Sequence, residues 1–147
     1  MKAPFLIGRM IFGGFFLYNG IHHLREAESM AAYAKSKGVP SPKLAVQLSG
    51  VPLIIGGASV LLGIKPKIGA AAILAFLAGV SPVMHDFWRA EDPGRRQNDM
   101  ISFMKNMALA GGALALMGVE EPWEASVPVG QHQMSKKARK IARAIAA

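Results

Sequence analysis

Three long stretches of the sequence contain no charged side chain: residues 44–64, 68–84 and 106–119. An α-helix needs roughly 20 apolar residues to cross the ~30 Å hydrocarbon core of a bilayer. A helix of a soluble bundle would show a polar stripe at a 3.6-residue period, and these stretches show none. Together with residues 4–21, which carry only Arg9 as a charge, they predict a polytopic membrane protein.

The expected fold class is all-α, a membrane-embedded antiparallel four-helix bundle. We place its four spans at about residues 4–21, 44–64, 68–84 and 100–119. Residues 1–122 then form one four-span domain, and residues 123–147 form a basic C-terminal tail.

The segment between the first two spans has its own helical pattern. Leu24, Ala27, Ala31 and Ala34 recur at helical spacing, which predicts a helix that extends the first span or lies on the surface. The next connection is only Lys65–Pro66–Lys67, a tight turn. The last one, DFWRAEDPGRRQND, is polar, and we interpret its Pro93–Gly94 as a turn signal.

The C-terminal tail contains SKKARKIARAIAA, which predicts an amphipathic helix. Its small apolar stripe is formed by Met134, Ala138, Ile141 and Ile145. A basic amphipathic helix binds the anionic headgroups of a membrane surface, so lipid is an expected partner. The alternative is a frayed basic tail.

Four spans place both termini on one side of the membrane. Lys65, Lys67 and the basic tail favour the cytoplasm for that side under the positive-inside rule. The N-terminal segment fits a retained span better than a cleaved signal, because Arg9 interrupts its apolar stretch. We expect a multi-pass protein of a bacterial inner membrane, with the polar ends of the spans facing outward.

A weak glycine repeat suggests two repeated helical hairpins. Three spans contain a Gly-Gly pair that is followed, after five further residues, by another glycine: Gly13–Gly14…Gly20, Gly56–Gly57…Gly63 and Gly111–Gly112…Gly118. Small residues at this spacing let helix backbones approach closely in lipid. Glycine is common in membrane helices, so chance is the alternative.

Polar residues gather where the spans meet the outer boundary. The third span ends in SPVMHDFW, and the fourth contains FMKN inside an apolar run. Ionisable residues within a span indicate function by default, so we expect Lys105 to face the bundle and pair with His85 or Asp86. The alternative is a lysine that snorkels to the interface. The full candidate ligand-binding cluster is His85, Asp86, Trp88, Lys105, Asn106, His22 and His23.

Each of these residues also has a plainer interpretation. Trp88 at a boundary is typical of an aromatic-belt anchor. His22 and His23 are adjacent, so at most one faces the bundle easily. A metal site would need three or four convergent ligands, and the spacing of the histidines does not support one, so no metal is expected. Arg9, Tyr18 and Asn19 on the first span form a second candidate polar contact.

The sequence contains no autonomous catalytic motif. It has no cysteine, no Gly-rich phosphate loop, no nucleophile elbow and no haem, flavin or nucleotide motif. The net charge of +8 is concentrated beside a membrane span, which favours lipid over nucleic acid as a partner.

Several motifs resemble the DoxX family of small four-helix membrane proteins. They are GRMIFGGFFLYNGIHHL, YAKSKGVPSP, GIKPKIGA, HDFW and FMKNMALAGGAL, which together span about residues 7–118. The family name comes from a quinone-linked thiosulfate-oxidising system, and other members resemble membrane partners of redox or detoxifying enzymes. The resemblance therefore implies a membrane protein associated with a redox complex, and quinone as its possible cofactor.

Two functions remain open at this point. The first is a non-catalytic membrane subunit or scaffold of a larger complex, with other subunits or a second copy as partners. The second is a redox subunit, at most part of an oxidoreductase, that binds quinone or a small ligand at His85 and Lys105. The absence of cysteine favours the first.

Overall fold

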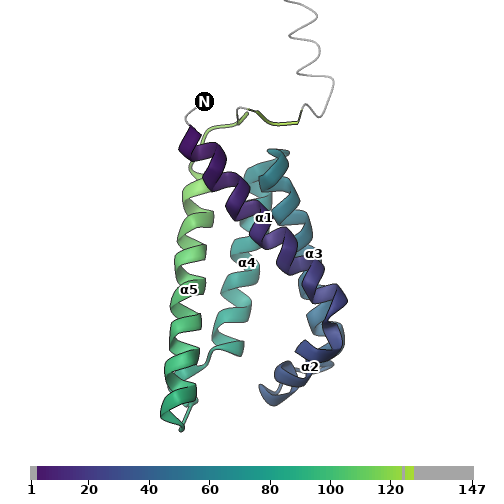
Figure 1. Ribbon diagram of the computed structural model, residues 1–147, viewed down its shortest axis with the longest axis vertical. Coiled ribbons are helices and arrows are strands. Elements are labelled where there is room, and N and C mark those ends of the chain that lie inside the picture. Colours follow the sequence, from purple (N-terminus) through teal and green to yellow (C-terminus); the bar gives the residue numbers. More distant parts are fainter. Residues whose placement is uncertain (1–2, 124, 128–147) are drawn as a thin grey trace, which may run out of the picture.

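The computed structural model describes residues 3–123 and 125–127, and every regular element in this part of the chain is helical. The order of the elements, drawn in Figure 1, is α1 (Ala3–Arg25), α2 (Ala27–Ser36), α3 (Pro42–Leu62), α4 (Pro66–Met84), η1 (Phe87–Arg89) and α5 (Pro93–Met117). The predicted tail helix lies outside the described residues.

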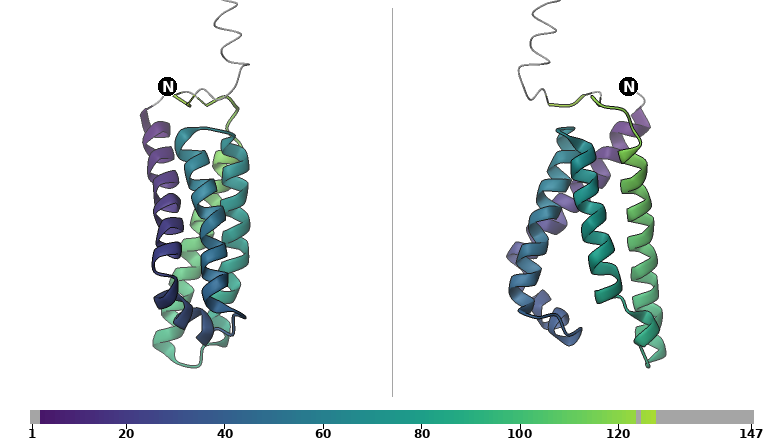
Figure 2. Two further views of the ribbon diagram at one scale, coloured as in Figure 1. Left: turned by 90° about the vertical axis from the view of Figure 1, so that its right-hand side faces the viewer. Right: turned by 180° about the vertical axis from the view of Figure 1, so that it is seen from behind.

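The part of the chain that the structure describes contains four helical segments long and apolar enough to cross a membrane: α1, α3, the segment Pro66–Arg89 that contains α4 and η1, and α5. Consecutive long helices run in opposite directions, and α2 lies at one end of the bundle (Figure 2). The predicted all-α, antiparallel four-helix fold is confirmed.

Proline starts three of these helices. Pro42, Pro66 and Pro93 occupy the first turns of α3, α4 and α5, where a missing N–H costs no helical hydrogen bond. Asp92 caps α5 by accepting hydrogen bonds from the N–H groups of Gly94 (3.3 Å) and Arg95 (3.5 Å).

The fourth span therefore begins earlier than the sequence indicated. We expected it to begin near Met100 and interpreted Pro93–Gly94 as a turn, but α5 starts at Pro93. The physical reason is the cap: an aspartate followed by proline is a helix-start signal that outweighs the polarity of residues 94–99. About two extra helical turns result, and they carry Arg95 and Asp99.

The closest helix pair is α1 with α3, and glycine makes it possible. A Cβ atom at Gly13 would lie 2.9 Å from the carbonyl oxygen of Gly57, and one at Gly20 would lie 2.8 Å from that of Gly50. These distances leave no room for a side chain, so the two backbones touch directly. Without a hydrophobic drive between helices in lipid, such close packing is a main source of association.

Gly56 repeats this arrangement toward α4, where its Cβ would lie 2.8 Å from the carbonyl oxygen of Gly69. The adjacent glycines Gly56 and Gly57 thus pack against two different helices, Gly56 against α4 and Gly57 against α1. The glycines of the repeat have different roles in different spans, because Gly63 and Gly118 are the C-cap residues that end α3 and α5. The hydrophobic core is built by Phe16, Leu53, Val60, Ala70, Ile73, Leu77, Ala113 and Trp123.

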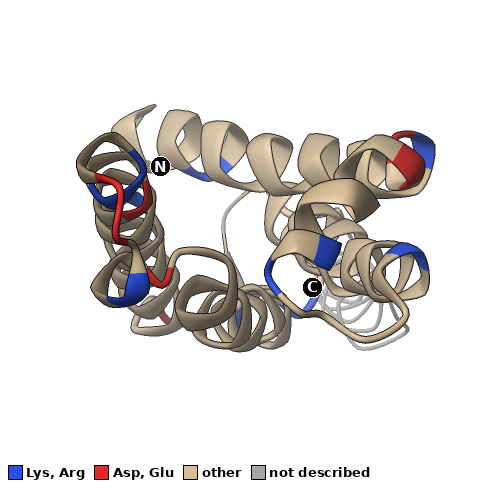
Figure 3. Cartoon of the chain, turned by 90° about the horizontal axis from the view of Figure 1, so that it is seen from below, with Lys and Arg blue, Asp and Glu red and all other residues tan. Residues whose placement is uncertain are grey.

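The helix α1 runs obliquely over the other spans, with its first turns near α5 and its last turns beside α3 (Figure 1). Near the first end, a Cβ at Gly112 of α5 would lie 3.1 Å from the ring of Phe12. The two helices diverge toward the other end (Figure 1). Seen from that end, acidic positions lie on α2 and around the corner between α4 and α5 (Figure 3).

The predicted surface helix is α2, which is separate from α1. Three residues of the predicted helical stripe, Ala27, Ala31 and Ala34, are buried, whereas Leu24 lies in α1 and is exposed. Ala27 and Ala34 pack with Val46 of α3, and Met84 at the end of α4 lies against this group. This packing brings the C-terminal end of α2 toward the α4–α5 corner.

We predict that Gly57→Ala destabilises the bundle, because the new methyl group would meet backbone atoms of α1 that cannot move aside. Overpacking of this kind costs about 1–3 kcal/mol. The control is Gly14→Ala, since a Cβ at Gly14 meets no heavy atom within 4 Å. Thermal unfolding in detergent should show a lower midpoint for the first variant only; equal midpoints would contradict the proposed backbone contact.

Candidate functional site

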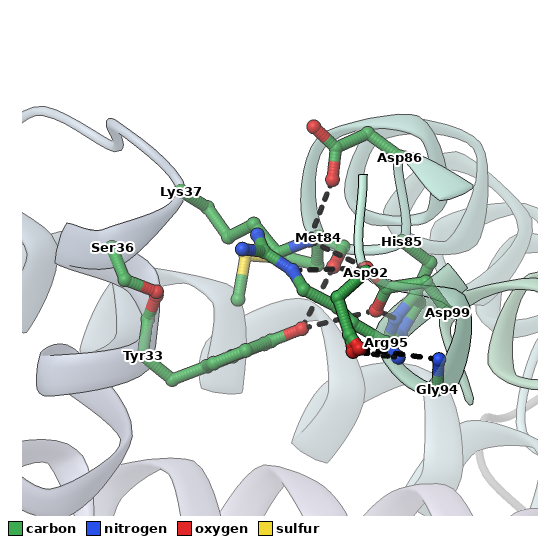
Figure 4. Close-up of polar contacts among 10 residues, drawn as sticks. All are labelled: Tyr33, Ser36, Lys37, Met84, His85, Asp86, Asp92, Gly94, Arg95 and Asp99. Carbon is green, nitrogen blue, oxygen red and sulfur yellow. Dashed lines mark hydrogen bonds and ion pairs between the residues drawn. The ribbon is translucent and has the colours of Figure 1, made fainter. Parts of the chain in front are cut away.

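The end of α2 carries a lysine into contact with two carboxylates of other elements. Lys37 is the C-cap residue of α2, and its N–H donates to the carbonyl oxygens of Tyr33 and Ala34. Its Nζ donates to Oδ1 of Asp86 at 2.5 Å and to Oδ2 of Asp99 at 2.8 Å (Figure 4). Asp86 lies in the corner after α4, and Asp99 lies on α5, so one ammonium joins three parts of the chain.

Asp99 is the centre of this group. Its Oδ1 accepts a hydrogen bond from the hydroxyl of Tyr33 at 3.3 Å. His85 Nδ1 lies 3.6 Å from the same oxygen, which is too long for a hydrogen bond and makes an ion pair only when the imidazole is protonated. Arg95 Nε lies 3.8 Å from Oδ2. We call these six residues the Lys37 cluster: Tyr33, Lys37, His85, Asp86, Arg95 and Asp99.

The centre of the Lys37 cluster is removed from water. The side chain of Lys37 is 1% exposed and that of Asp99 is 6% exposed, whereas Asp86 keeps 20% of its surface. The two cations Lys37 and Arg95 match the two carboxylates Asp86 and Asp99 in number. Buried charges persist only when they are paired and hydrogen-bonded, and this group meets that condition.

The protonation states of the two α2 residues are well defined. Burial disfavours the charged form of Lys37, but hydrogen bonds to Asp86 and Asp99 outweigh it and raise the pKa above the usual 10.5. Burial also raises the pKa of Tyr33 above its usual value. Lys37 is therefore a cation and Tyr33 a neutral donor at any physiological pH.

The Lys37 cluster closes one end of the bundle. Tyr33 adds a second link, because its hydroxyl donates to the carbonyl oxygen of Met84 at 3.1 Å. These polar contacts join α2, which is packed on α3, to the corner between α4 and α5 (Figure 4). Chemically, the arrangement can hold two carboxylates ionised around one fixed cation.

Of the predicted ligand-binding residues, His85 and Asp86 belong to this cluster, and Lys105 does not. Lys105 is exposed, and within residues 3–123 and 125–127 it has no ion pair. The expected pairing of Lys105 with His85 or Asp86 is wrong, because Lys37 occupies Asp86 and Asp99 lies beside His85.

Trp88 and Asn106 make separate contacts. Trp88 is half exposed, and its ring packs edge-on against Phe87 and Phe103. Asn106 of α5 donates from Nδ2 to the hydroxyl of Ser81 on α4 at 3.1 Å. Trp88 therefore suits a boundary anchor, and Asn106 joins two helices within the bundle.

The two adjacent histidines point apart, as expected. His23 faces α3, where its Nδ1 lies 2.8 Å from the hydroxyl of Ser49, while His22 is exposed and stacks on Tyr18. In the described part of the chain, no group of three or more His, Cys, Asp or Glu side chains is placed to hold a metal ion.

The second candidate contact divides into two places. Arg9 is buried, and its guanidinium donates to the carbonyl oxygens of Leu61 at 3.2 Å and Ala125 at 3.1 Å. It also lies over the ring of Trp123, 5.8 Å from the centroid. Asn19 instead donates to the carbonyl of Phe15 in its own helix. Arg9 thus holds the segment after α5 against the first turns of α1.

Sequence reasoning missed Lys37, Tyr33 and Asp99, which form the centre of the site. Both α2 residues lie within YAKSKGVPSP, a motif used only for the family resemblance. Asp99 was assigned to a loop because the start of α5 was placed at Met100. The Asp92–Pro93 cap was the available signal, since a helix from Pro93 would have put Asp99 on an inward face.

One comparison with known proteins gives a match. The family whose profile matches is DoxX, over residues 5–86, more than half of the chain. This range covers α1 to α4 and ends at Asp86, so it includes Lys37 and His85 but stops before α5. Neither the curated proteins nor the solved structures gave a match.

We predict that Lys37→Met destabilises the protein by about 3 kcal/mol, the lower end of the range for breaking a buried pair, because Asp86 keeps some contact with water. Lys35→Met, on the exposed side of the same helix, is the matched control and should change little. Thermal unfolding in detergent measures both variants.

A further variant separates lost pairing from lost packing. Lys37→Met combined with Asp99→Asn removes a stranded charge together with its partner, so it should lose less stability than the sum of the two single changes. Additive losses, or a Lys37→Met variant as stable as Lys35→Met, would contradict the assigned role.

Proposed function

This chain belongs to the DoxX family, and we propose that it is a non-catalytic membrane subunit or scaffold of a larger membrane complex. The observation that supports the proposal is that the buried charges of the Lys37 cluster are paired with one another. Its buried ammonium donates to two carboxylates of the same chain, so its charges are used in holding helices together.

A catalytic or ligand-binding group must be free to meet another molecule. Lys37 is enclosed, and Asp99 is nearly so. The chain has no cysteine for thiol chemistry. A bundle whose buried carboxylates are paired with its own Lys37 suits the role of a platform for other subunits, because these charges need no ligand to balance them.

The alternative is a quinone- or small-ligand-binding redox subunit. A quinone carbonyl would need a hydrogen-bond donor, and the buried donor of the cluster, Lys37, already serves Asp86 and Asp99. His85 Nδ1 is buried without a hydrogen bond among the described residues, which is too little to define a quinone site. The residues therefore fit a quinone poorly, and no electron-transfer step is derived.

The proposed location is a bacterial inner membrane, with both termini in the cytoplasm and the Lys37 cluster on the outer side. Lys65 lies in the α3–α4 turn, at the end of the bundle that also carries the start of α1. With the basic tail, this end is the more basic one in short segments, which retains it in the cytoplasm. The tail would then contact anionic headgroups of the inner leaflet.

Reporter fusions test the orientation. A fusion at Glu91, in the corner between α4 and α5, should report the periplasm, and a fusion at the C-terminus should report the cytoplasm. The two reporters together check that α5 crosses the membrane and in which direction it does so. Signals from the same side would contradict four spans, and exchanged signals would reverse the orientation.

Purification in mild detergent tests the function. If the chain is a scaffold, other membrane proteins should co-purify with it at a fixed stoichiometry, and extracted pigments and lipids should contain no stoichiometric quinone. Lys37→Met should lower the yield of the complex in proportion to its lower stability. A monomer that carries stoichiometric quinone would favour the redox-subunit alternative.

A further inference from the structure

The helix α5 is much less covered by the rest of the chain than the other spans. Only 6% of its most apolar segment is buried, compared with 33% for α3 and 28% for the span that begins with α4. The residues of its outer face are all exposed, and we call them the α5 face: Ile101, Met104, Lys105, Ala108, Gly111 and Ala115. An exposed apolar face by itself fits contact with lipid, so the case for a protein partner depends on the charge on this face.

Lys105 is the only charged residue in residues 100–119. It lies five residues after Met100, so its Cα is about 8 Å along the helix axis from the polar first turns of α5. Arg9 is the other cation that lies well inside a long helix of the described bundle. It is buried against Leu61 and Trp123. Lys105 is exposed and has no ion pair among the described residues.

A cation at this depth calls for a carboxylate from outside the chain. The nine acidic residues lie at positions 26, 28, 86, 91, 92, 99, 120, 121 and 124, and none falls within residues 100–119 or the apolar parts of the other spans. A second copy of this chain could therefore offer Lys105 no acid at its own depth. A symmetric contact through the α5 face would also bring two Lys105 cations together.

We propose that the α5 face docks a transmembrane helix of a different protein, with an Asp or Glu of that helix paired with Lys105. This inference rests on the proposed scaffold function and names the partner's chemistry. In an apolar environment such a pair is strong and selective, because an uncompensated charge on either helix disfavours the separated state.

The side-chain direction places the partner's acid. Side chains of a helix tilt toward its N-terminus, so the ammonium of Lys105 lies over the turn that contains Ile101. The acid of the partner helix should therefore sit level with residues 101–105. This position lies on the half of α5 that leads to the Lys37 cluster.

The α5 face can also accept a helix at short range. Ala108, Gly111 and Ala115 are small, and a Cβ added at Gly111 would meet nothing within 4 Å. Within this molecule, glycines at Gly13 and Gly57 already bring two helix backbones into direct contact. The α5 face offers the same close approach, and no helix among the described residues lies against it. Its charge and its small residues therefore both favour a docked helix.

Photocrosslinking in native membranes tests the proposal with the full chain. A benzoylphenylalanine replaces Met104 or Ala108 on the α5 face, and the matched control position is Ile68 on α4, which is 66% exposed. We expect a protein adduct of discrete mass from the first two positions and not from Ile68. Its span should contain an acidic residue.

Charge reversal then distinguishes a specific pair from proximity. Lys105→Glu should lower the adduct yield at least about tenfold, which corresponds to about 1.4 kcal/mol, while Lys105→Arg should retain it. Changing the partner's acid to lysine should restore the adduct with Lys105→Glu. Thermal unfolding of the purified chain should be the same for all Lys105 variants, because Lys105 supports no contact within the described bundle.

The outcomes separate this inference from the proposed function. Adducts with lipid alone or with a second copy of the chain would overturn the inference. So would a protein adduct whose yield is the same for Lys105→Glu as for the wild-type chain. If subunits co-purify but crosslink through other faces, the scaffold function survives and the inference fails. If no protein co-purifies with the wild-type chain, both fail.

Discussion

The direct backbone contact between α1 and α3 is the constraint on which the rest of the bundle depends. Gly13 against Gly57 and Gly20 against Gly50 fix these helices to each other along their length. Lipid supplies no hydrophobic drive to hold helices together, so this close fit defines one rigid pair. The oblique path of α1 follows from it, and so does the divergence of α1 from α5 at the α2 end.

Two buried cations secure the ends that the glycine contact leaves open. At one end, Arg9 holds the segment after α5 against α1 and α3 through carbonyl oxygens and the Trp123 ring. At the other end, Lys37 joins α2 to the α4–α5 corner through Asp86 and Asp99. In both places a charge that would be costly when alone becomes a link between distant segments, because its partners come from different elements.

The proposed function depends on the difference between Lys37, which is paired, and Lys105, which has no ion pair among the described residues. Lys37 is paired inside the molecule and holds the scaffold together. Lys105 lies exposed within a span and is the cation that an outside helix could satisfy. If the chain is the subunit that we propose, its specificity for a partner would reside on α5, beyond the region that the DoxX profile matches.

Sequence alone determined the helical class, the four spans and the helical conformation of the segment that forms α2, because each depends on local hydrophobic length or periodicity. His85 and Asp86 were also found, since their position at the end of an apolar run is visible in the sequence. The start of α5 was missed, although Asp92 and Pro93 carried a local signal for it. Only the tertiary structure decided that Asp86 and Asp99 pair with Lys37 and that Lys105 faces outward. Such pairing depends on the rotation and tilt of whole helices, which the glycine contacts set and no local pattern records.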